Sequence, residues 1–171
     1  MKIPDFNYKG FIVRGFDCNE SGIWRIEIPC DFGSDLDLAF RNHVASSGNS
    51  DKVFDFFDSK SVAKINKEEF LEKIPLDLKR LLPDLALKMK FSQLDVYGLF
   101  CVKSVYSVVN RSLGICALIG FGDIAINRFY DLIPALIRAG GALLVIDYFG
   151  VYRDVLDKIE PTPQQIIFQN R

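Results

Sequence analysis

The sequence predicts one compact domain over residues 1–171, of the α/β or α+β class, with an N-terminal β-hairpin, several short helices and a C-terminal βαβ unit. Two short apolar runs, Ile115–Ile119 and Ala142–Ile146, are typical of strands buried on both faces. The segment between them starts at a glycine turn, repeats apolar residues at helical spacing and ends at Gly140-Gly141. Two buried strands joined by one helix predict a right-handed parallel βαβ unit.

The hairpin is expected near the N-terminus. Phe11–Cys18 and Ile23–Ile28 both have strand composition, and the second run alternates between two sets of side chains. The residues between the runs have turn chemistry, so the two strands are expected to pair with each other. Pro29 ends the second strand because proline cannot donate a hydrogen bond to a neighbouring strand.

Cap residues followed by carboxylates predict where helices begin. Ser34 starts a helix that is expected to reach about Val44. Asn66 starts a second helix, which Pro75 ends, and Leu76–Leu82 then adds a further turn or two.

The remaining elements follow from apolar periodicity. Asp51–Asp58 is expected to be a short amphipathic helix and Leu85–Phe91 a half-buried strand. Val96–Val109 indicates a long, nearly buried helix, although its valines and aromatic residues leave two strands over 93–109 as the competing interpretation. Beyond the βαβ unit, Val151–Ile159 is expected to be a helix and Ile166–Phe168 an edge strand.

Charge and hydropathy exclude several classes of protein. The net charge is −1, so the chain has no basic excess with which to hold nucleic acid. Residues 1–90 carry 14 Lys/Arg and 15 Asp/Glu, against 7 and 7 in residues 91–171. The first half is therefore expected to form a charged, aromatic-rich layer over a more buried second half. Neither a signal peptide nor a run of about 20 apolar residues is evident, which favours a cytoplasmic protein without a membrane span.

The cysteines and the only histidine do not form a recognised chemical motif. None of the four cysteines has CxxC spacing, and we expect reduced, mostly buried thiols. Cys18, Cys30 and His43 lack the spacing of known metal ligands, so no metal site is expected. With a single histidine and no credible catalytic set, the sequence leans towards a protein that is not an enzyme.

An acidic, aromatic segment suggests a function in protein binding. It could dock a basic partner or simply form the solvated side of an amphipathic element. The candidate partner-binding residues are Asp51, Phe54, Asp55, Phe57 and Asp58. The first functional interpretation is a non-enzymatic binding protein, such as an inhibitor, an immunity-type protein, an adaptor or an assembly component. It would act through protein–protein interaction and would need no cofactor.

The glycine turn supports an alternative function. Gly120-Phe121-Gly122-Asp123-Ile124-Ala125 fits the pattern G-x-G-x-x-G/A directly after a predicted strand, and Asp147 ends the next strand. Residues 114–148 thus resemble the dinucleotide-binding βαβ fingerprint of Rossmann-type proteins. The resemblance implies that Gly120 makes the tight turn and Gly122 admits a pyrophosphate at the helix N-terminus. Ala125 takes the third position of the motif, and Asp147 would bind the ribose hydroxyls.

The end of the same stretch resembles a second family. AGGALLVIDYF, from Ala139 to Phe149, is similar to a late strand of class I methyltransferases. These resemblances imply a small regulatory domain or enzyme that binds a dinucleotide or an S-adenosylmethionine-like ligand. In the competing interpretation, the glycines only shape the strand-to-helix turn and end the helix, and Asp147 is a strand-end residue.

Overall fold

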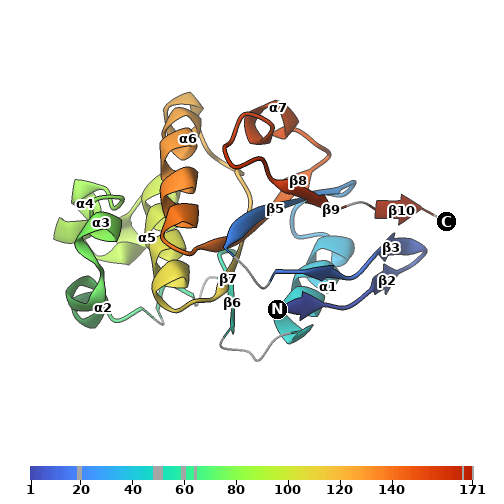
Figure 1. The fold of residues 1–171 in the computed structure, drawn as a ribbon, viewed down its shortest axis with the longest axis horizontal. Coiled ribbons are helices and arrows are strands. Elements are labelled where there is room, and N and C mark those ends of the chain that lie inside the picture. Colours follow the sequence, from blue (N-terminus) through green and yellow to red (C-terminus); the bar gives the residue numbers. More distant parts are fainter. Residues whose placement is uncertain (19–20, 48–51, 59–60, 64, 167, 171) are drawn as a thin grey trace.

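A five-stranded parallel sheet forms the centre of the molecule (Figure 1). The computed structural model describes residues 1–18, 21–47, 52–58, 61–63, 65–166 and 168–170. The strand order is β6-β7-β8-β5-β9, and every neighbouring pair is parallel. The strands are β5 (Gly22–Ile28), β6 (Val53–Asp55), β7 (Leu113–Cys116), β8 (Ala142–Tyr148) and β9 (Gln164–Ile166). With helices on both faces of this sheet, the predicted α/β class is confirmed.

The predicted βαβ unit is confirmed as β7, α6 (Asp123–Arg138) and β8. The two strands lie side by side with Leu113 opposite Ala142. Gly140 has a φ of +90°, which suits the residue that ends a helix. The N–H of Gly141 donates to the carbonyl of Leu136 at 2.8 Å, so the chain turns at once into β8.

The predicted pairing of Phe11–Cys18 with Ile23–Ile28 is wrong. β5 instead lies between β8 and β9 and runs parallel to both. Side chains on both faces of β5 are buried, including that of Arg25. The alternation of apolar and polar residues along this strand therefore does not mark a face exposed to solvent. The N-terminal hairpin is formed by β2 (Phe6–Tyr8) and β3 (Phe11–Val13). Three further strands complete this region, namely β1 (Lys2–Ile3), β4 (Phe16–Asp17) and β10 (Phe168–Asn170).

Two further predictions of secondary structure are wrong. The described part of Asp51–Asp58 contains strand β6, which pairs with β7. The expected strand at Leu85–Phe91 is helix α4 (Asp84–Lys88), followed by the 3₁₀ turn η2 (Phe91–Gln93). In both cases a short run carried a weak local preference, and contacts with distant segments decided its conformation.

The other predicted helices are confirmed, some with shifted ends. They are α1 (Asp35–Ser47), α2 (Lys67–Lys73), α3 (Leu76–Lys79), α5 (Val96–Val109) and α7 (Arg153–Leu156). Residues 96–109 form one helix, which resolves the alternative of two strands. Asp95 caps it by accepting a hydrogen bond from Gly98 N at 2.7 Å.

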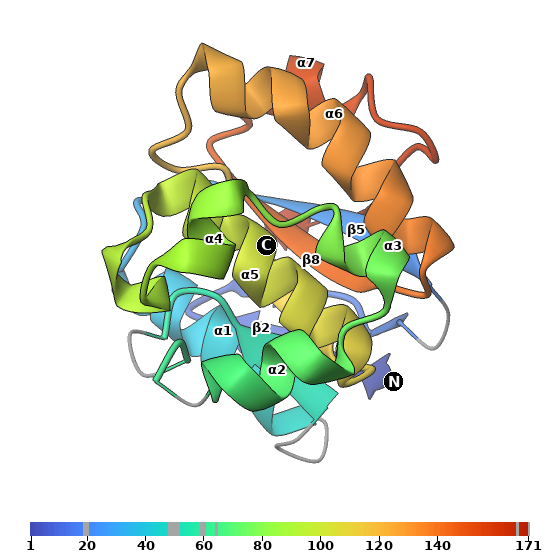
Figure 2. The ribbon, with the colours of Figure 1, turned by 90° about the vertical axis from the view of Figure 1, so that its left-hand side faces the viewer.

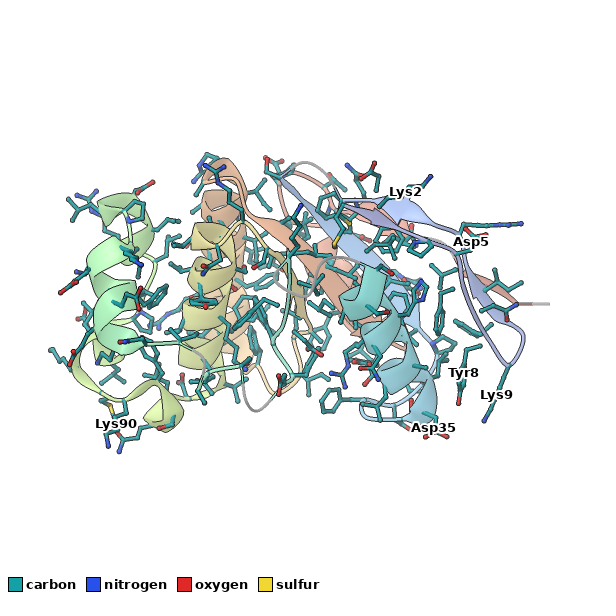
Figure 3. All side chains as sticks on the ribbon, turned by 90° about the horizontal axis from the view of Figure 1, so that it is seen from below. Lys2, Asp5, Tyr8, Lys9, Asp35 and Lys90 are labelled. Carbon is teal, nitrogen blue, oxygen red and sulfur yellow. The ribbon has the colours of Figure 1, made fainter. Side chains whose placement is uncertain are left out.

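The helices divide into layers on the two faces of the sheet. Residues of α5, α6 and α7 pack against Leu143 and Val145, and α2 to α4 lie outside α5 (Figure 2). On the opposite face, α1 packs against Ile26 and Ile146 and is covered by the hairpin. Figure 3 shows the layers in sequence, from Lys90 at one end to Tyr8 and Lys9 at the other. Over the described residues, the structure has no helix long and apolar enough to cross a membrane.

Candidate functional site

The carboxyl ends of the parallel strands are where an open α/β sheet most often binds ligands. β5 is followed by α1 on one face, whereas β6, β7 and β8 lead to helices on the other. The loop after β5 therefore crosses this edge of the sheet. Within it, Phe32 reaches Phe57, which follows β6, with the ring centroids 4.9 Å apart. The ring of Phe32 also lies 5.9 Å from that of Tyr148 at the end of β8.

A cavity of about 260 Å³ opens at this edge, at the ends of β6 and β7. Its walls come from the β5–α1 loop, the residues after β6 and β7, and the first turns of α5. The lining residues are Phe32, Phe56, Phe57, Val96, Leu99, Phe100, Lys103, Cys116, Ala117, Ile119 and Phe121. Because Phe32, Val96 and Ile119 are exposed, the cavity has an open rim.

Edge-to-face aromatic contacts fix the inner wall. The rings of Phe56 and Phe100 have centroids 5.6 Å apart, and those of Phe100 and Phe121 are 5.2 Å apart. Both pairs are close to perpendicular, which is a favourable geometry for aromatic rings. The inner wall is therefore held in place by packing between these rings.

Lys103 is the one charged side chain among the described residues that line this cavity. It projects from α5, is only 8% exposed, and its Nζ donates a hydrogen bond to the carbonyl of Phe56. Burial lowers the pKa of the Lys103 amine, and the nearby carboxylates of Asp55 and Asp58 oppose that shift. An amine in a largely apolar, aromatic cavity is the main chemical feature of the site.

A buried ion network supports the outer wall. The guanidinium of Arg41 lies 4.9 Å from the ring centroid of Phe57 and 5.6 Å from that of Phe32. Arg41 also donates to Asp37 at 3.1 Å through Nε and to Asp55 at 2.8 Å through Nη1. Since Phe32 and Phe57 both line the cavity, this network sets the position of its aromatic wall.

The network is anchored to the sheet by Tyr148. Its hydroxyl donates to Asp37 Oδ1 at 2.7 Å, and the Asp37 side chain is fully buried. Burial is the largest cause that raises the pKa of Tyr148, and the bond to Asp37 adds to it. The phenol thus stays a hydrogen-bond donor at neutral pH.

The predicted glycine turn lies beside the cavity. Gly120 has a φ of +78°, and its neighbours Ile119 and Phe121 are lining residues. Gly122 is the N-cap of α6, and a Cβ added there would meet no atom within 4 Å. Packing within the protein therefore does not require glycine at this position. Ala125 is half-buried in the first turn of α6.

Asp147 lies away from the cavity lining and is engaged inside the protein. Its Oδ1 accepts a hydrogen bond from Tyr152 N at 2.9 Å, and its Oδ2 lies 3.2 Å from Arg25 Nη2. The side chain is fully buried, and burial raises its pKa. The structure thus brings Gly120 and Gly122 together at the turn but places Asp147 in an ion cluster beside β5.

The acidic, aromatic candidates are separated by the alternation of β6. Phe54 packs against Phe56 and Tyr106 on the α5 side, whereas Phe57 meets Arg41. Asp55 accepts hydrogen bonds from Arg41 and from Phe57 N. Asp58 is half-buried. Asp51 lies outside the described residues.

Sequence reasoning missed Lys103, Arg41 and Asp37. Two features of the sequence nevertheless pointed to these residues. Lys103 is the only charged residue in the largely apolar run 96–109. Asp37 and Arg41 have the i, i+4 spacing of an ion pair on one face of a helix. All four cysteines are free thiols. Among the described residues, no cluster of three or more His, Cys, Asp and Glu side chains could hold a metal ion.

The fold and the site define an open parallel α/β protein with an aromatic cavity at the carboxyl edge of its sheet. No protein-family model matches the chain, and no curated protein matches it significantly in sequence.

Proposed function

We propose that this chain binds a small, largely apolar molecule that carries one carbonyl or carboxylate oxygen. The observation that carries this proposal is the buried amine of Lys103 in a cavity lined mainly by aromatic and aliphatic side chains. Ligand sites typically combine an apolar lining with a few polar groups that fix the orientation of the ligand. The position at the carboxyl edge of a parallel sheet agrees with this assignment.

The size of the cavity limits the ligand. An apolar cavity of about 150 Å³ holds benzene, and drug-sized ligands occupy pockets of about 300–1,000 Å³. A cavity of about 260 Å³ therefore suits one aromatic ring or a short branched chain with a small polar group. A whole dinucleotide exceeds this volume and would have to lie outside, along the Gly120–Gly122 turn.

The polar end of the ligand is expected at Lys103. A lysine ammonium has three N–H donors, and one of them is directed at the carbonyl of Phe56. A ligand oxygen at the remaining donors would form a hydrogen bond to a buried charge, which contributes about 1.5–3 kcal/mol. This contribution corresponds to a preference of about tenfold or more for a ligand with the oxygen.

Three probes of similar size test the proposal in titrations followed by NMR. We expect acetophenone and benzoate to bind, and ethylbenzene, which lacks the oxygen, to bind about tenfold or more weakly. Lys103→Met should abolish this preference while leaving ethylbenzene binding unchanged. Ala117→Phe should fill the cavity and weaken the binding of all three probes.

Lys88→Met is the matched control because Lys88 is exposed on α4 and does not line the cavity. An unchanged preference for acetophenone and benzoate over ethylbenzene in Lys103→Met, or no binding by any probe to the wild type, would contradict the proposal. Adding NAD(H) and S-adenosylmethionine to the same titration tests the nucleotide alternative. Those ligands should shift the amides around Gly122 if that alternative is correct, and Gly122→Val should abolish the shifts.

Protein–protein interaction is the second candidate function. The observation that favours it is Phe149, which is 59% exposed in the loop after β8, two residues before Val151 at 70%. Phe149 has a φ of +56°, a conformation that bulky residues rarely adopt. Its N–H donates to Ile28 O at 2.9 Å, so the backbone holds the residue in this exposed place. Contiguous exposed apolar patches mark protein contact surfaces, so we take Phe149 together with Val151 as the proposed contact residues.

The partner expected at this surface is a protein that contributes apolar side chains to the contact. Phe149→Ser combined with Val151→Ser should prevent its cross-linking to the purified chain. Leu76→Ser is the control, because Leu76 is equally exposed but lies on α3. If cross-linking of the partner is lost in both the double variant and Leu76→Ser, or is retained in both, Phe149 and Val151 do not form the contact surface.

A further inference from the structure

We propose that Lys103 forms a reversible imine with a carbonyl ligand held in the cavity. The inference rests on the proposed function and goes one step further, because it makes the amine a nucleophile as well as a hydrogen-bond donor. Three features of the site lead to it, namely the burial of the amine, the position of Nζ and the aromatic lining.

The first feature is the loss of water around the amine. Lys103 is 8% exposed, and its side chain enters the cavity among Phe56, Phe57 and Phe100. A charged ammonium is poorly solvated there, which favours the neutral amine, while the nearby carboxylates of Asp55 and Asp58 oppose that shift without cancelling it. The neutral form carries the lone pair that attacks a carbonyl carbon, and desolvated lysines are activated in this way.

The second feature is the hydrogen bond from Nζ to the carbonyl of Phe56. That carbonyl belongs to the backbone directly after β6, so a fixed element holds the end of a long side chain in place. The bond uses an N–H donor and leaves the lone pair of a neutral amine for the ligand. A positioned nucleophile loses less freedom when it reacts.

The third feature is the rest of the lining. Apart from Lys103, Cys116 is the other nucleophilic side chain among the lining residues, and burial raises the pKa of its thiol well above the ordinary value. It therefore stays protonated and weakly reactive at neutral pH. The aromatic side chains offer water few hydrogen-bond partners next to the imine, which slows its hydrolysis.

The reaction is balanced without any further reagent. The nitrogen lone pair forms a bond to the carbonyl carbon, and the carbonyl oxygen takes up a proton to give a carbinolamine. Loss of that hydroxyl group with the second nitrogen proton releases one water molecule and leaves a C=N bond. Water entering through the open rim reverses the reaction and regenerates the amine and the carbonyl compound.

Borohydride trapping of the wild-type chain tests the inference. Benzaldehyde is added at pH 7, samples are reduced at intervals, and peptide mass spectrometry measures the benzyl group on each lysine. We expect Lys103 to be labelled faster than the exposed lysines, since a lower pKa raises the fraction of neutral amine at pH 7. Benzoate should slow labelling of Lys103 alone, because it occupies the cavity without forming an imine.

The exposed lysines of the same molecule, such as Lys88 and Lys158, are internal controls that do not depend on the folding of a variant. Lys103→Arg provides a second measurement and should remove the fast phase. If benzoate and acetophenone bind but Lys103 is labelled no faster than the exposed lysines, the imine is overturned and the proposed binding function stands. If no probe binds, both the imine and the proposed binding function are contradicted.

Discussion

Among individual residues, Asp37 and Arg41 contribute most to the shape of the site. Both are buried, and they join α1 to Asp55 in β6 and to Tyr148 in β8. Burying charges costs solvation free energy, which their mutual attraction and hydrogen bonds offset. Phe32 and Phe57 also cover the guanidinium, in a cation–π arrangement. The conformation of the aromatic wall thus depends on charged residues behind it.

Asp37→Ala should therefore be strongly destabilising. The change leaves Arg41 without its i, i+4 partner and removes the acceptor of the Tyr148 hydroxyl. Removing one partner of a buried pair costs about 3–5 kcal/mol. Glu69→Ala is the matched control, since it breaks the exposed i, i+4 pair with Lys73 and should change the stability little. Urea unfolding measures both, and similar losses in the two variants would show that the buried network contributes little.

Among the elements, the βαβ unit depends on close contact where α6 ends and β8 begins. A Cβ added at Gly141 would lie 2.8 Å from the carbonyl oxygen of Leu136 and 2.8 Å from Cγ2 of Val108. Gly141 therefore allows the start of β8 to pass between the end of α6 and α5. Gly122, at the other end of α6, has open space around it. The two glycines serve different purposes although both stand next to the same helix.

Gly141→Ala should lower the free energy of unfolding by about 1–3 kcal/mol, because the added methyl group overpacks a backbone contact. Gly122→Ala should cost no more than about 1 kcal/mol, the difference between glycine and alanine as an N-cap. Denaturant unfolding of the two variants gives the comparison directly. An equal or larger loss in Gly122→Ala would mean that the turn is more tightly packed than the structure shows.

At the scale of the whole molecule, the site is made from segments far apart in the sequence. Four different connections or helices supply the lining residues Phe32, Phe57, Lys103 and Phe121. These residues meet only because β5 and β6 join the sheet formed by β7 and β8. Both halves of the chain thus supply strands to the sheet. The β5–α1 loop crosses the carboxyl edge because β5 and β6 are separated by two strands. The cavity is therefore a product of the strand order.

The functional candidates drawn from the sequence depend on this order in different ways. The Gly120 turn could be located from its local pattern, and it does lie beside the cavity. Asp147 could be placed at the end of its strand, but its ion pair with Arg25 depends on β5 being the neighbour of β8. Asp55 and Phe57 stand out in the sequence as acidic and aromatic, yet their contacts with Arg41 follow from the pairing of β6 with β7.

The sequence by itself determined that helices and strands are combined in one fold, and it located the βαβ unit and the starts of helices such as α1 and α2. These features depend on capping and on apolar spacing, which act over a few residues and can be read locally. Only the tertiary structure decided that Ile23–Ile28 lies inside the parallel sheet, that residues 53–55 form a strand and that Lys103 meets the backbone of Phe56. Strand partners and cavities arise from contacts between distant segments, for which a local pattern carries no signal.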